Sequence, residues 1–288
     1  MINNNSEILF IYDAKGANPN GDMDNENKPR MDYDTNTNLV TDTRLKRYIR
    51  DYAEMKDKEI FITNKAKDAD DRVKQLGDVK EVLNLIDIKL FGAVIANKDA
   101  DSFTGPVQFN WGYSLNPVEL QESSTITSSF SSGTGIGNDF RVNYSLLAFN
   151  GSINANVAKK MKFDDEYFGP TNKTIKFLDE AMIKSIPANR TRSKIGQTPR
   201  LYLRVETKDN LTFLNDLREF VDYNSEKSDE KLRSIDDISL DISNLIDYLN
   251  KYKDDIDTIH FWKDINLEIN KEQIYELENN FNIKKLSF

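Results

Sequence analysis

Apolar positions in the first part of the chain follow two different periods, which predict a strand and then a helix. The run EILFIYD at residues 7–13 is rich in β-branched and aromatic side chains and predicts a strand. Leu45, Ile49 and Tyr52 recur at spacings of four and three, which places them on one face of a helix. This helix is expected over about residues 41–55, because polar residues that can cap it stand at its start.

The pattern further along the chain completes an alternating order of elements. Residues 68–91 and 171–185 carry apolar stripes at helical spacing, whereas residues 107–115 and 200–206 alternate and predict strands. The resulting order of strand, helix, strands, helix, strand is that of the split β-α-β arrangement of ferredoxin-like and RNA-recognition (RRM) folds. The expected fold class is therefore α+β, with a βαββαβ core that carries insertions.

An uncharged segment interrupts this order. Residues 123–138 (SSTITSSFSSGTGIGN) combine β-branched residues with glycines at positions 133, 135 and 137. This composition predicts a β-hairpin with a flexible tip that protrudes from the body of the protein. Residues 141–149 are expected to form the return strand.

Charge is unevenly distributed along the chain. Residues 1–205 carry 28 acidic and 28 basic side chains, whereas residues 206–288 carry 20 acidic and 11 basic ones, which accounts for the net charge of -9. Because affinity for phosphate depends on the local field, the neutral part can still bind nucleic acid. Residues 207–288 have helical patterns at 240–252 and 272–281, and we expect an acidic helical appendage there rather than a catalytic domain.

Composition excludes several classes of protein. With 38% hydrophobic residues in 288, the chain has enough apolar material for a core. It contains no cysteine and only one histidine, His260, so disulfides and the familiar zinc, Cys–His and His–His sites are excluded. No apolar run approaches the ~20 residues that span a bilayer, and the first residues do not resemble a signal peptide. We expect a cytoplasmic protein without a membrane partner and without a cofactor.

Two basic segments are candidates for contacts with phosphate. The first is the predicted helix at residues 41–52, whose cations are Arg44, Lys46, Arg47 and Arg50. Arginine presents a planar fork that matches the geometry of a phosphate group. The alternative is an ordinary solvated face, on which Arg47 and Arg50 pair with Asp51 or Glu54.

The second basic segment is RTRSKIGQTPR at residues 190–200. No acidic residue occurs between Ala181 and Val205. The basic residues of this stretch are Lys184, Arg190, Arg192, Lys194, Arg200 and Arg204. Gly196 and Pro199 keep its middle irregular, which lets backbone N–H groups face an anion. The alternative, a basic loop that pairs with the acidic C-terminal segment, stays open.

A long loop rich in turn residues is predicted over residues 14–38, after the first strand. Carboxylates cluster in and before it, at Asp13, Asp22, Asp24, Glu26, Asp32 and Asp34. Clustered carboxylates can bind a hard cation, but this spacing does not fit a calcium-binding loop. A plain acidic loop is favoured, and no metal site is predicted.

The string NPNGDMDNENKPRMDYDTNTNLVTDTRLKRYIRDY, residues 18–52, resembles the start of the backbone subunits of the CRISPR Cascade complex, in the type I-B and I-C branch of the DevR-like family. Those proteins begin with a strand, an NPNGD loop, a PR-x-D turn and a V-[ST]-D-x-R-L-K-R helix. Three later segments agree in order: LFGAV at 90–94, GPVQ at 105–108 and RSKIGQTPRLYLRVE at 192–206, and the last favours the type I-B branch. The resemblance covers about residues 7–206.

The resemblance implies a subunit that binds the guide RNA (crRNA) and is not an enzyme. Such subunits have the shape of a right hand, and their regions are named accordingly. The resemblance implies an RRM-like palm within residues 1–206, helical fingers at about 56–105 and a β-hairpin thumb at about 123–142. Residues 207–288 have no counterpart among the matching motifs. The subunits stack head to tail along the crRNA beside other Cascade subunits, and target DNA pairs with the exposed guide.

By motif position, the implied RNA contacts are Asn18, Asn20, Arg44, Lys46, Arg47, Arg50, Gln108, Arg141, Arg190, Arg192 and Lys194. The thumb would insert Ile126 and Phe130 as wedges between bases. Two alternatives stay open. One is an RNA-guided RNA nuclease that uses an Asp of the loop at 18–34, as related type III subunits do. The other is a general single-stranded nucleic-acid-binding protein that carries no guide.

Overall fold

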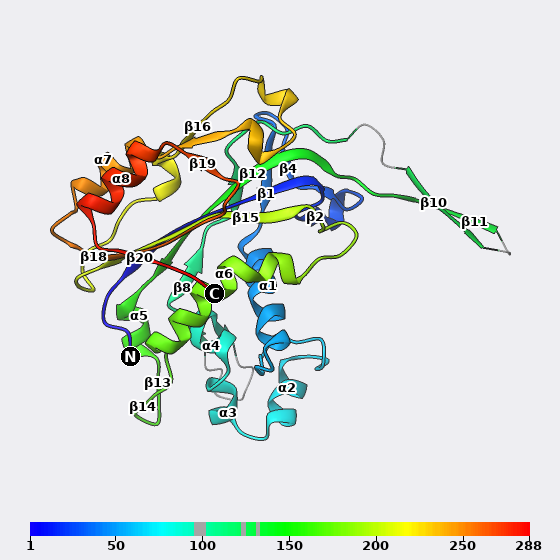
Figure 1. Ribbon diagram of the computed structural model, residues 1–288. Coiled ribbons are helices and arrows are strands. Elements are labelled where there is room, and N and C mark those ends of the chain that lie inside the picture. Colours follow the sequence, from blue (N-terminus) through cyan, green and yellow to red (C-terminus); the bar gives the residue numbers. More distant parts are fainter. Residues whose placement is uncertain (95–101, 122–124, 131–132) are drawn as a thin grey trace.

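One large sheet organises the chain, and other parts of the molecule cover both of its faces (Figure 1). The computed structural model describes residues 1–94, 102–121, 125–130 and 133–288, with the backbone alone for residues 94, 126–130 and 133–136. The strands of this sheet are β1 Ser6–Ala17, β4 Met31–Asp32, β5 Thr37–Val40, β8 Val107–Phe109, β9 Gly112–Ser114, β12 Val142–Ile153, β15 Gln197–Thr207, β18 Ile256–Lys263 and β20 Ile283–Lys285. Within the described residues the sheet has nine strands, of which eight follow the order β20-β18-β15-β1-β12-β9-β5-β4, while β8 pairs with β12 beside this path.

The central strand β1 has apolar side chains on both faces. It pairs antiparallel with β12 and with β15, so that Phe10 lies opposite both Phe149 and Tyr202. Phe10 packs toward one face of the sheet and Leu9 and Ile11 toward the other. A strand that is buried on both faces has a continuous apolar run rather than a clean alternation. The strand predicted at residues 7–13 is therefore confirmed, and it is longer than the prediction.

The helices are α1 Asp42–Met55, α2 Ala69–Leu76, α3 Val79–Leu83, α4 Ile86–Phe91, α5 Ala155–Lys160, α6 Asn172–Ala188, α7 Ser243–Asn250 and α8 Lys271–Asn280. Helix α1 begins where predicted, because the hydroxyl of Thr41 accepts a hydrogen bond from the Arg44 N–H at 3.2 Å. Helix α6 has a reciprocal cap between Thr171 and Thr174. The single helix predicted at 68–91 is instead three short helices, and the first of them ends at Gly77, whose φ of 86° lies outside the helical region.

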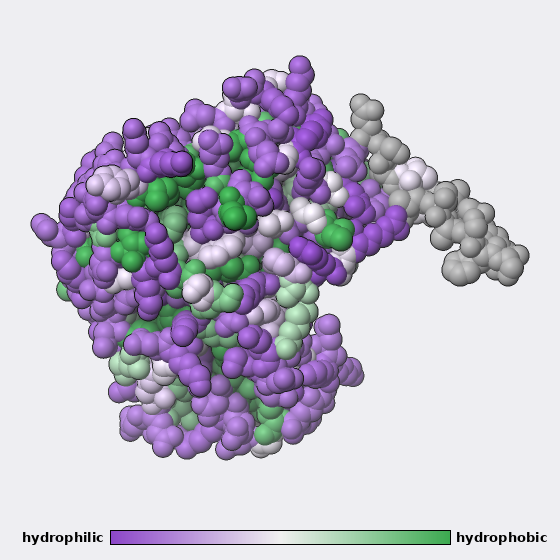
Figure 2. Space-filling view, viewed as in Figure 1, coloured by the Kyte–Doolittle hydropathy of each residue, from purple (hydrophilic) through white to green (hydrophobic). Residues whose placement is uncertain are grey.

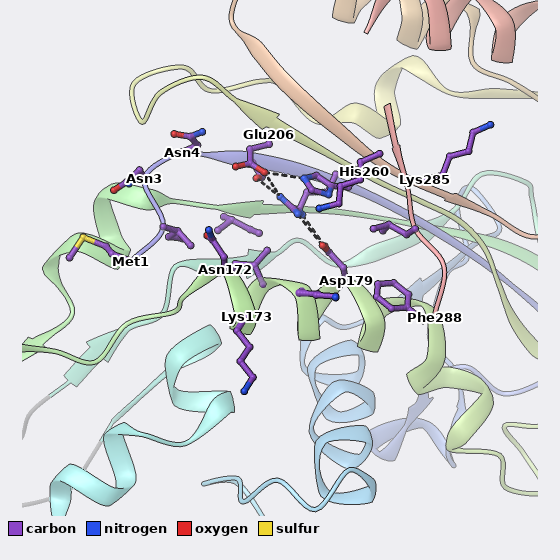
Figure 3. A pocket seen from close by; sticks show the side chains of 18 of the residues that line it. Met1, Asn3, Asn4, Asn172, Lys173, Asp179, Glu206, His260, Lys285 and Phe288 are labelled. Atoms are coloured by element: carbon purple, nitrogen blue, oxygen red, sulfur yellow. Dashed lines mark hydrogen bonds and ion pairs between the residues drawn. The ribbon is translucent and has the colours of Figure 1, made fainter. Parts of the chain in front are cut away.

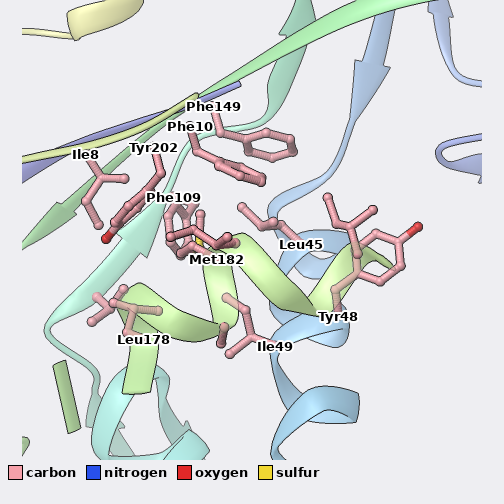
Figure 4. Close-up of a cluster of buried hydrophobic side chains, with 14 of the residues drawn as sticks. Ile8, Phe10, Leu45, Tyr48, Ile49, Phe109, Phe149, Leu178, Met182 and Tyr202 are labelled. Carbon is pink, nitrogen blue, oxygen red and sulfur yellow. The ribbon is translucent and has the colours of Figure 1, made fainter. Parts of the chain in front are cut away.

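Helices α1 and α6 cover one face of the sheet and form the main core with it (Figure 4). Phe10, Phe149 and Tyr202 project from the sheet toward Leu45 of α1 and Met182 of α6. All five side chains are essentially buried. The apolar stripes predicted from sequence therefore face the sheet, while the charged residues of the two helices are exposed or, like Arg50 and Asp179, held in buried ion pairs.

The opposite face of the sheet is covered by residues 214–281, and this differs from the helical appendage expected there. Strand β18 pairs antiparallel with β15, and β20 pairs parallel with β18, so both extend the main sheet. Three more strands, β16 Asp222–Asn224, β17 Ser239–Asp241 and β19 Glu268–Ile269, form a small sheet beside α7 and α8. Although this segment is acidic, its apolar residues alternate with the charged ones and pack on the main sheet. The segment is therefore an integral layer of the fold.

Four short hairpins lie outside the main sheet in the described part of the chain. The pairs are β2 Gly21–Asp22 with β3 Lys28–Pro29, β6 Gly92–Val94 with β7 Ser102–Thr104, β13 Lys162–Phe163 with β14 Glu166–Tyr167, and β10 Thr125–Phe130 with β11 Gly133–Asn138. The segment predicted as a loop at 14–38 instead contains the end of β1, the hairpin β2–β3 and the paired strands β4 and β5.

The predicted uncharged hairpin exists as the antiparallel pair β10–β11, which projects far from the body of the molecule (Figure 1). The side chains of Ile126 and Phe130, expected as wedges, lie outside the described part of the structure. The surface of the body in the same view is mostly hydrophilic, with small apolar areas between polar side chains (Figure 2). In the described part of the chain, no helix combines the length and the apolar character that a bilayer crossing requires.

Candidate nucleic-acid interface

The loop between α6 and β15, residues 189–196, is fixed against the end of β1. The N–H of Asn18 donates to the Ser193 carbonyl at 2.8 Å, and the N–H of Lys15 donates to the Gly196 carbonyl at 2.9 Å. Gly196 has a φ of 98°, and a Cβ on it would stand 2.3 Å from the Lys15 carbonyl oxygen. Only glycine allows this close approach, so this residue sets the path of the basic loop.

The same loop also contacts α1 and the start of β12. The Asn189 amide donates to the Tyr48 carbonyl at 3.3 Å, on α1. Arg141 donates from Nη2 to the Arg192 carbonyl at 3.2 Å and from Nη1 to the Gly16 carbonyl at 2.9 Å. Tertiary structure thereby brings together four segments that are far apart in sequence: the end of β1, the first half of α1, the residues before β12 and the basic loop.

Arg44 and Lys194 lie at the centre of this junction. The Lys194 Nζ donates to the carbonyls of Asn18 at 2.5 Å and Pro19 at 3.3 Å. The Arg44 guanidinium stands 4.0 Å over the Tyr48 ring. Within the described residues neither cation forms a salt bridge, and the Nε of Arg44 is buried without a hydrogen-bond partner.

The electrostatics of this pair favour an anion. Burial, together with the positive charge of Arg44, lowers the pKa of Lys194 to about 7. A partly buried positive charge without a carboxylate partner is unfavourable, and a bound anion relieves that penalty. The arrangement of Arg44 and Lys194 is therefore one that can accept an anion, and both are among the residues that the resemblance implies.

Exposed cations surround the pair, and one unforeseen carboxylate lies among them. Arg190 is exposed, and the Arg192 side chain is 68% exposed. Asp139 pairs with Arg141 at 2.7 Å and lies 3.7 Å from Arg192. The sequence shows no acid near Arg192, because Asp139 comes from a segment some fifty positions away along the chain. Arg192 keeps most of its surface available in spite of this contact.

The other cations of α1, which the sequence places in a row of possible phosphate contacts, have acidic partners in the structure. Lys46 pairs with Asp42 at 3.0 Å. The buried Arg50 pairs with Asp87 at 3.1 Å, and burial lowers its pKa. The guanidinium of Arg50 consequently holds α4 against α1 and is not part of the open surface.

Arg47 also has acidic partners. It pairs with Asp51 and lies 3.5 Å from Glu54. These are the partners expected for Arg47 if this side of the helix is an ordinary solvated face. Within the described residues, Arg44 is thus the member of the α1 quartet that has no acidic partner.

The two asparagines of the first loop shape the protein around the junction. The Asn20 Oδ1 accepts hydrogen bonds from the Thr41 N–H at 2.9 Å and from its hydroxyl at 3.0 Å, which ties the loop to the start of α1. Asn18 is 2% exposed, and its amide donates to the Asn27 carbonyl at 2.8 Å. Their side chains position Arg44 and Lys194, and the backbone of this loop is what lies beside Lys194.

Gln108 and Lys46 form a separate pair. The Lys46 Nζ lies 3.4 Å from the Gln108 Oε1 and 5.6 Å from the centre of the Phe91 ring. Because residues two apart on a helix point about 200° from each other, Lys46 projects away from the side that carries Arg44. The structure thus divides the predicted contacts into a main junction and a smaller polar site beside β8.

Two of the six basic residues counted at 181–205 serve the fold. Arg200 pairs with Asp13 at 2.8 Å and with Asp264 of the C-terminal layer at 2.5 Å. Arg204 is buried and pairs with Asp179 at 2.9 Å. The alternative of pairing with the acidic C-terminal segment therefore holds for Arg200.

The acidic loop makes local contacts. Asp22 lies 3.0 Å from Arg30, and the Asp32 Oδ1 accepts from the Asp34 N–H at 3.0 Å. Over residues 1–94, 102–121, 125–130 and 133–288, no group of three or more potential ligands is placed to hold a metal ion.

Comparisons with known proteins agree with the sequence resemblance. The chain matches the family described as CRISPR-associated protein Cas7 over residues 4–243. It is 32% identical to the CRISPR-associated protein Cas7 of Haloferax volcanii over 310 aligned positions, which cover 92% of this chain and 88% of that protein.

Two solved structures are similar in fold, and each covers 96% of this chain and 99% of its own. One is a chain of a CRISPR RNA-guided surveillance complex, with a TM-score of 0.54 at 14% identity. The other is a chain of such a complex in a pre-nicking state, with a TM-score of 0.57 at 11% identity. Since the family match spans most of the sequence and the Haloferax relative aligns along nearly all of it, the chain belongs to the Cas7 family of CRISPR-associated proteins.

Proposed function

We propose that this chain is a non-catalytic backbone subunit of a type I CRISPR interference complex, of the type I-B branch, and that it binds the guide RNA. The observation that carries the proposal is the couple of Arg44 and Lys194, which has no acidic partner among the described residues and is held where four distant segments meet. Family membership and the similarity to chains of RNA-guided surveillance complexes support it.

The core of the sheet fits an RRM-like palm. Strands β1 and β12 are central, β15 and β9 flank them, and α1 and α6 lie together on one face. This arrangement, with α1 after the first strand and α6 before the last, supports a βαββαβ ferredoxin-like unit. In this reading the helical segment at about 56–105 forms the fingers, and the hairpin β10–β11 forms the thumb.

The junction would hold the RNA through its backbone. Arg44 offers a planar donor group, Lys194 a compact charge, and the exposed Arg190 and Arg192 extend the positive surface along the loop. Such contacts do not depend on base identity, which suits a protein that must accept any guide. Bases left free would pair with target DNA, and copies would follow one another head to tail, with the thumb of each copy reaching the next.

The experiment compares two matched arginine variants of the same helix. Arg44→Gln removes the unpaired cation, whereas Arg47→Gln removes one already neutralised by Asp51. We expect Arg44→Gln to weaken binding of single-stranded RNA about tenfold and to lower the salt dependence by about one unit, with little effect from Arg47→Gln. Equal effects of the two variants would contradict the assignment of this surface.

The nature of the bound RNA tests the guide itself. Protein purified from its native complex should absorb more at 260 than at 280 nm and should release RNA of one defined length. Protein that carries no discrete RNA and binds every oligonucleotide equally would instead indicate a general single-strand-binding protein.

A further inference from the structure

Two hollows meet at the first half of α6, on the side of the sheet that also carries α1. One, of about 700 Å³, is lined by Lys56, Lys58, Lys89, Lys173 and Lys176 around an apolar floor of Leu85, Ile86 and Phe177. The other, of about 710 Å³, shares Lys173 and Lys176 and adds Lys284 and Lys285 (Figure 3). Together the two hollows are lined by seven lysines.

Most of these lysines have no acidic partner within the described chain. Lys56 pairs with Glu180 at 2.9 Å, and Lys285 pairs with Glu278 at 2.7 Å. The lysines without a salt bridge in the described part, which we call the lysine surface, are Lys58, Lys89, Lys173, Lys176 and Lys284. Burial lowers the pKa of Lys89, because its ammonium group is partly removed from water and the described residues supply no carboxylate to stabilise its charge.

The carboxylates nearest to this surface do not neutralise it. In the second hollow, Asp179 is engaged by Arg204 at 2.9 Å, and Glu206 is engaged by Arg204 at 3.2 Å and by His260 at 3.0 Å (Figure 3). These groups form one network between α6 and the strands β15 and β18. In the first hollow, Glu59 pairs with Arg72 and Glu180 pairs with Lys56. Within the described residues, the lysine surface therefore has no carboxylate of its own to neutralise it.

The lysine surface is separate from the RNA junction. Lys173 stands in the first turn of α6, whereas the junction begins after its last residue, Ala188. A helix of 17 residues is about 25 Å long, so one RNA backbone contact does not reach both ends. The function proposed for Arg44 and Lys194 leaves this second positive surface unexplained.

The opposite face of the molecule carries the complementary charge. Exposed carboxylates without a salt bridge in the described part include Glu219, Asp222, Glu226, Glu230, Asp236, Asp247, Glu268, Glu272 and Glu276. Asp222 and Asp247 flank one spot, because the Asn244 amide donates to the Asp222 Oδ2 at 3.2 Å and Asp247 follows Asn244 by one turn of α7. This layer covers the face of the sheet away from α1 and α6 (Figure 1).

We propose that the lysine surface of one copy docks onto the acidic layer around Asp222 and Asp247 of the next copy. The two surfaces lie on opposite faces of one sheet, so the contact is heterologous and can repeat from copy to copy, as a coat along a guide requires. This inference rests on the proposed function and names the partner surfaces within it.

The composition of the first hollow favours a protein partner over a second nucleic acid. Its cations are lysines, and its aromatic ring, Phe177, is only 7% exposed, so it offers no platform for stacked bases. The lysines suit an acidic protein face, whose carboxylates can meet the ammonium groups while the lysine stems cover the apolar surface beside them.

Complementary charge reversal tests the contact. The first variant carries Lys173→Glu and Lys176→Glu, and the second carries Asp222→Lys and Asp247→Lys. All four positions are exposed, so both variants should fold as the wild type does. The control variant reverses Lys160 and Lys162, which are exposed and line neither hollow.

Two RNAs separate assembly from binding: one long enough for several copies and one that accommodates a single copy. Mass photometry on the long RNA should show that each variant alone needs about tenfold more protein to reach the wild-type copy number. An equimolar mixture of the two variants should restore assembly, because each reversed face then meets a complementary one. The control variant should assemble as the wild type does.

The short RNA distinguishes the ways in which the idea can fail. Both variants should bind it with wild-type affinity, since the junction at Arg44 is intact. Loss of this binding in the Lys173 and Lys176 variant would mean that the lysine surface binds nucleic acid, and failure of the mixture to recover would also overturn the contact. If the wild type itself does not bind the short RNA, the proposed function fails instead. If either charge reversal disturbs folding, the two positions are changed to alanine instead. The alanine variant should assemble more weakly on the long RNA and bind the short RNA as the wild type does; unchanged assembly would overturn the contact.

Discussion

Binding of RNA at the Arg44–Lys194 junction should take up a proton at alkaline pH. In the free protein, burial and the neighbouring Arg44 hold the pKa of Lys194 at about 7, against an ordinary value of 10.5. A phosphate group beside the ammonium stabilises its charged form and raises this pKa again. Bound RNA therefore prefers protonated Lys194, while the free protein above pH 7 is largely neutral at this position.

The size of the effect follows from linkage. Below about pH 7 the lysine is charged in both states, and affinity is independent of its titration. As pH rises above 7, affinity should fall by at most about tenfold per pH unit, which is about 1.4 kcal/mol, until the pKa of the bound state is reached. The fall between pH 7 and 9 is therefore limited to about 100-fold, and to less where the phosphate raises the pKa only in part.

Fluorescence anisotropy with a labelled single-stranded RNA, at constant ionic strength between about pH 6 and 9, measures this slope. Lys194→Arg keeps the charge at every pH, because an arginine does not titrate in this range, and it should make the profile flat. Lys194→Met should remove the slope and weaken binding below pH 7. A wild-type profile that is already flat would refute the placement of a phosphate beside Lys194, as would a slope that persists in Lys194→Arg.

Three other outcomes are expected. Burial raises the pKa of Glu7 from 4.5 to about 8. The stability that protonated Glu7 contributes is therefore fully present below pH 4.5 and is lost as pH rises through 8. Glu7→Gln should remove this pH-dependent loss of stability, which amounts to up to about 5 kcal/mol at pH 9 as measured by urea unfolding. Deletion of residues 126–138 should leave the melting temperature of the body unchanged but alter assembly on long RNA, and unaltered assembly would place the neighbour contact elsewhere. The assembled complex, incubated with complementary RNA and magnesium, should leave that RNA intact; metal-dependent cleavage that disappears in Asp22→Asn or Asp32→Asn would show a nuclease instead.

Local sequence pattern was sufficient for the elements whose partners are near in the chain. The strand at 7–13 and the helices at 41–55 and 171–185 follow from apolar periodicity and from hydroxyl caps, and these signals act within a few residues. The place of β18 was missed, although its run Ile256–Lys263 has the β-branched and aromatic residues of a strand. Its pairing with β15 bridges some fifty residues, and the acidity around it suggested a separate appendage.

The candidate site shows the same division more sharply. The sequence by itself determined which cations are present, that the basic loop at 189–196 must be irregular around Gly196, and that the chain resembles its family. Only the tertiary structure decided which charges remain open. Arg50 is neutralised by Asp87 and Arg192 is approached by Asp139, both from distant segments. Arg44 and Lys194 are brought together with no carboxylate partner among the described residues. Electrostatic energy depends on distance through space and on burial, and neither quantity exists until the chain has folded.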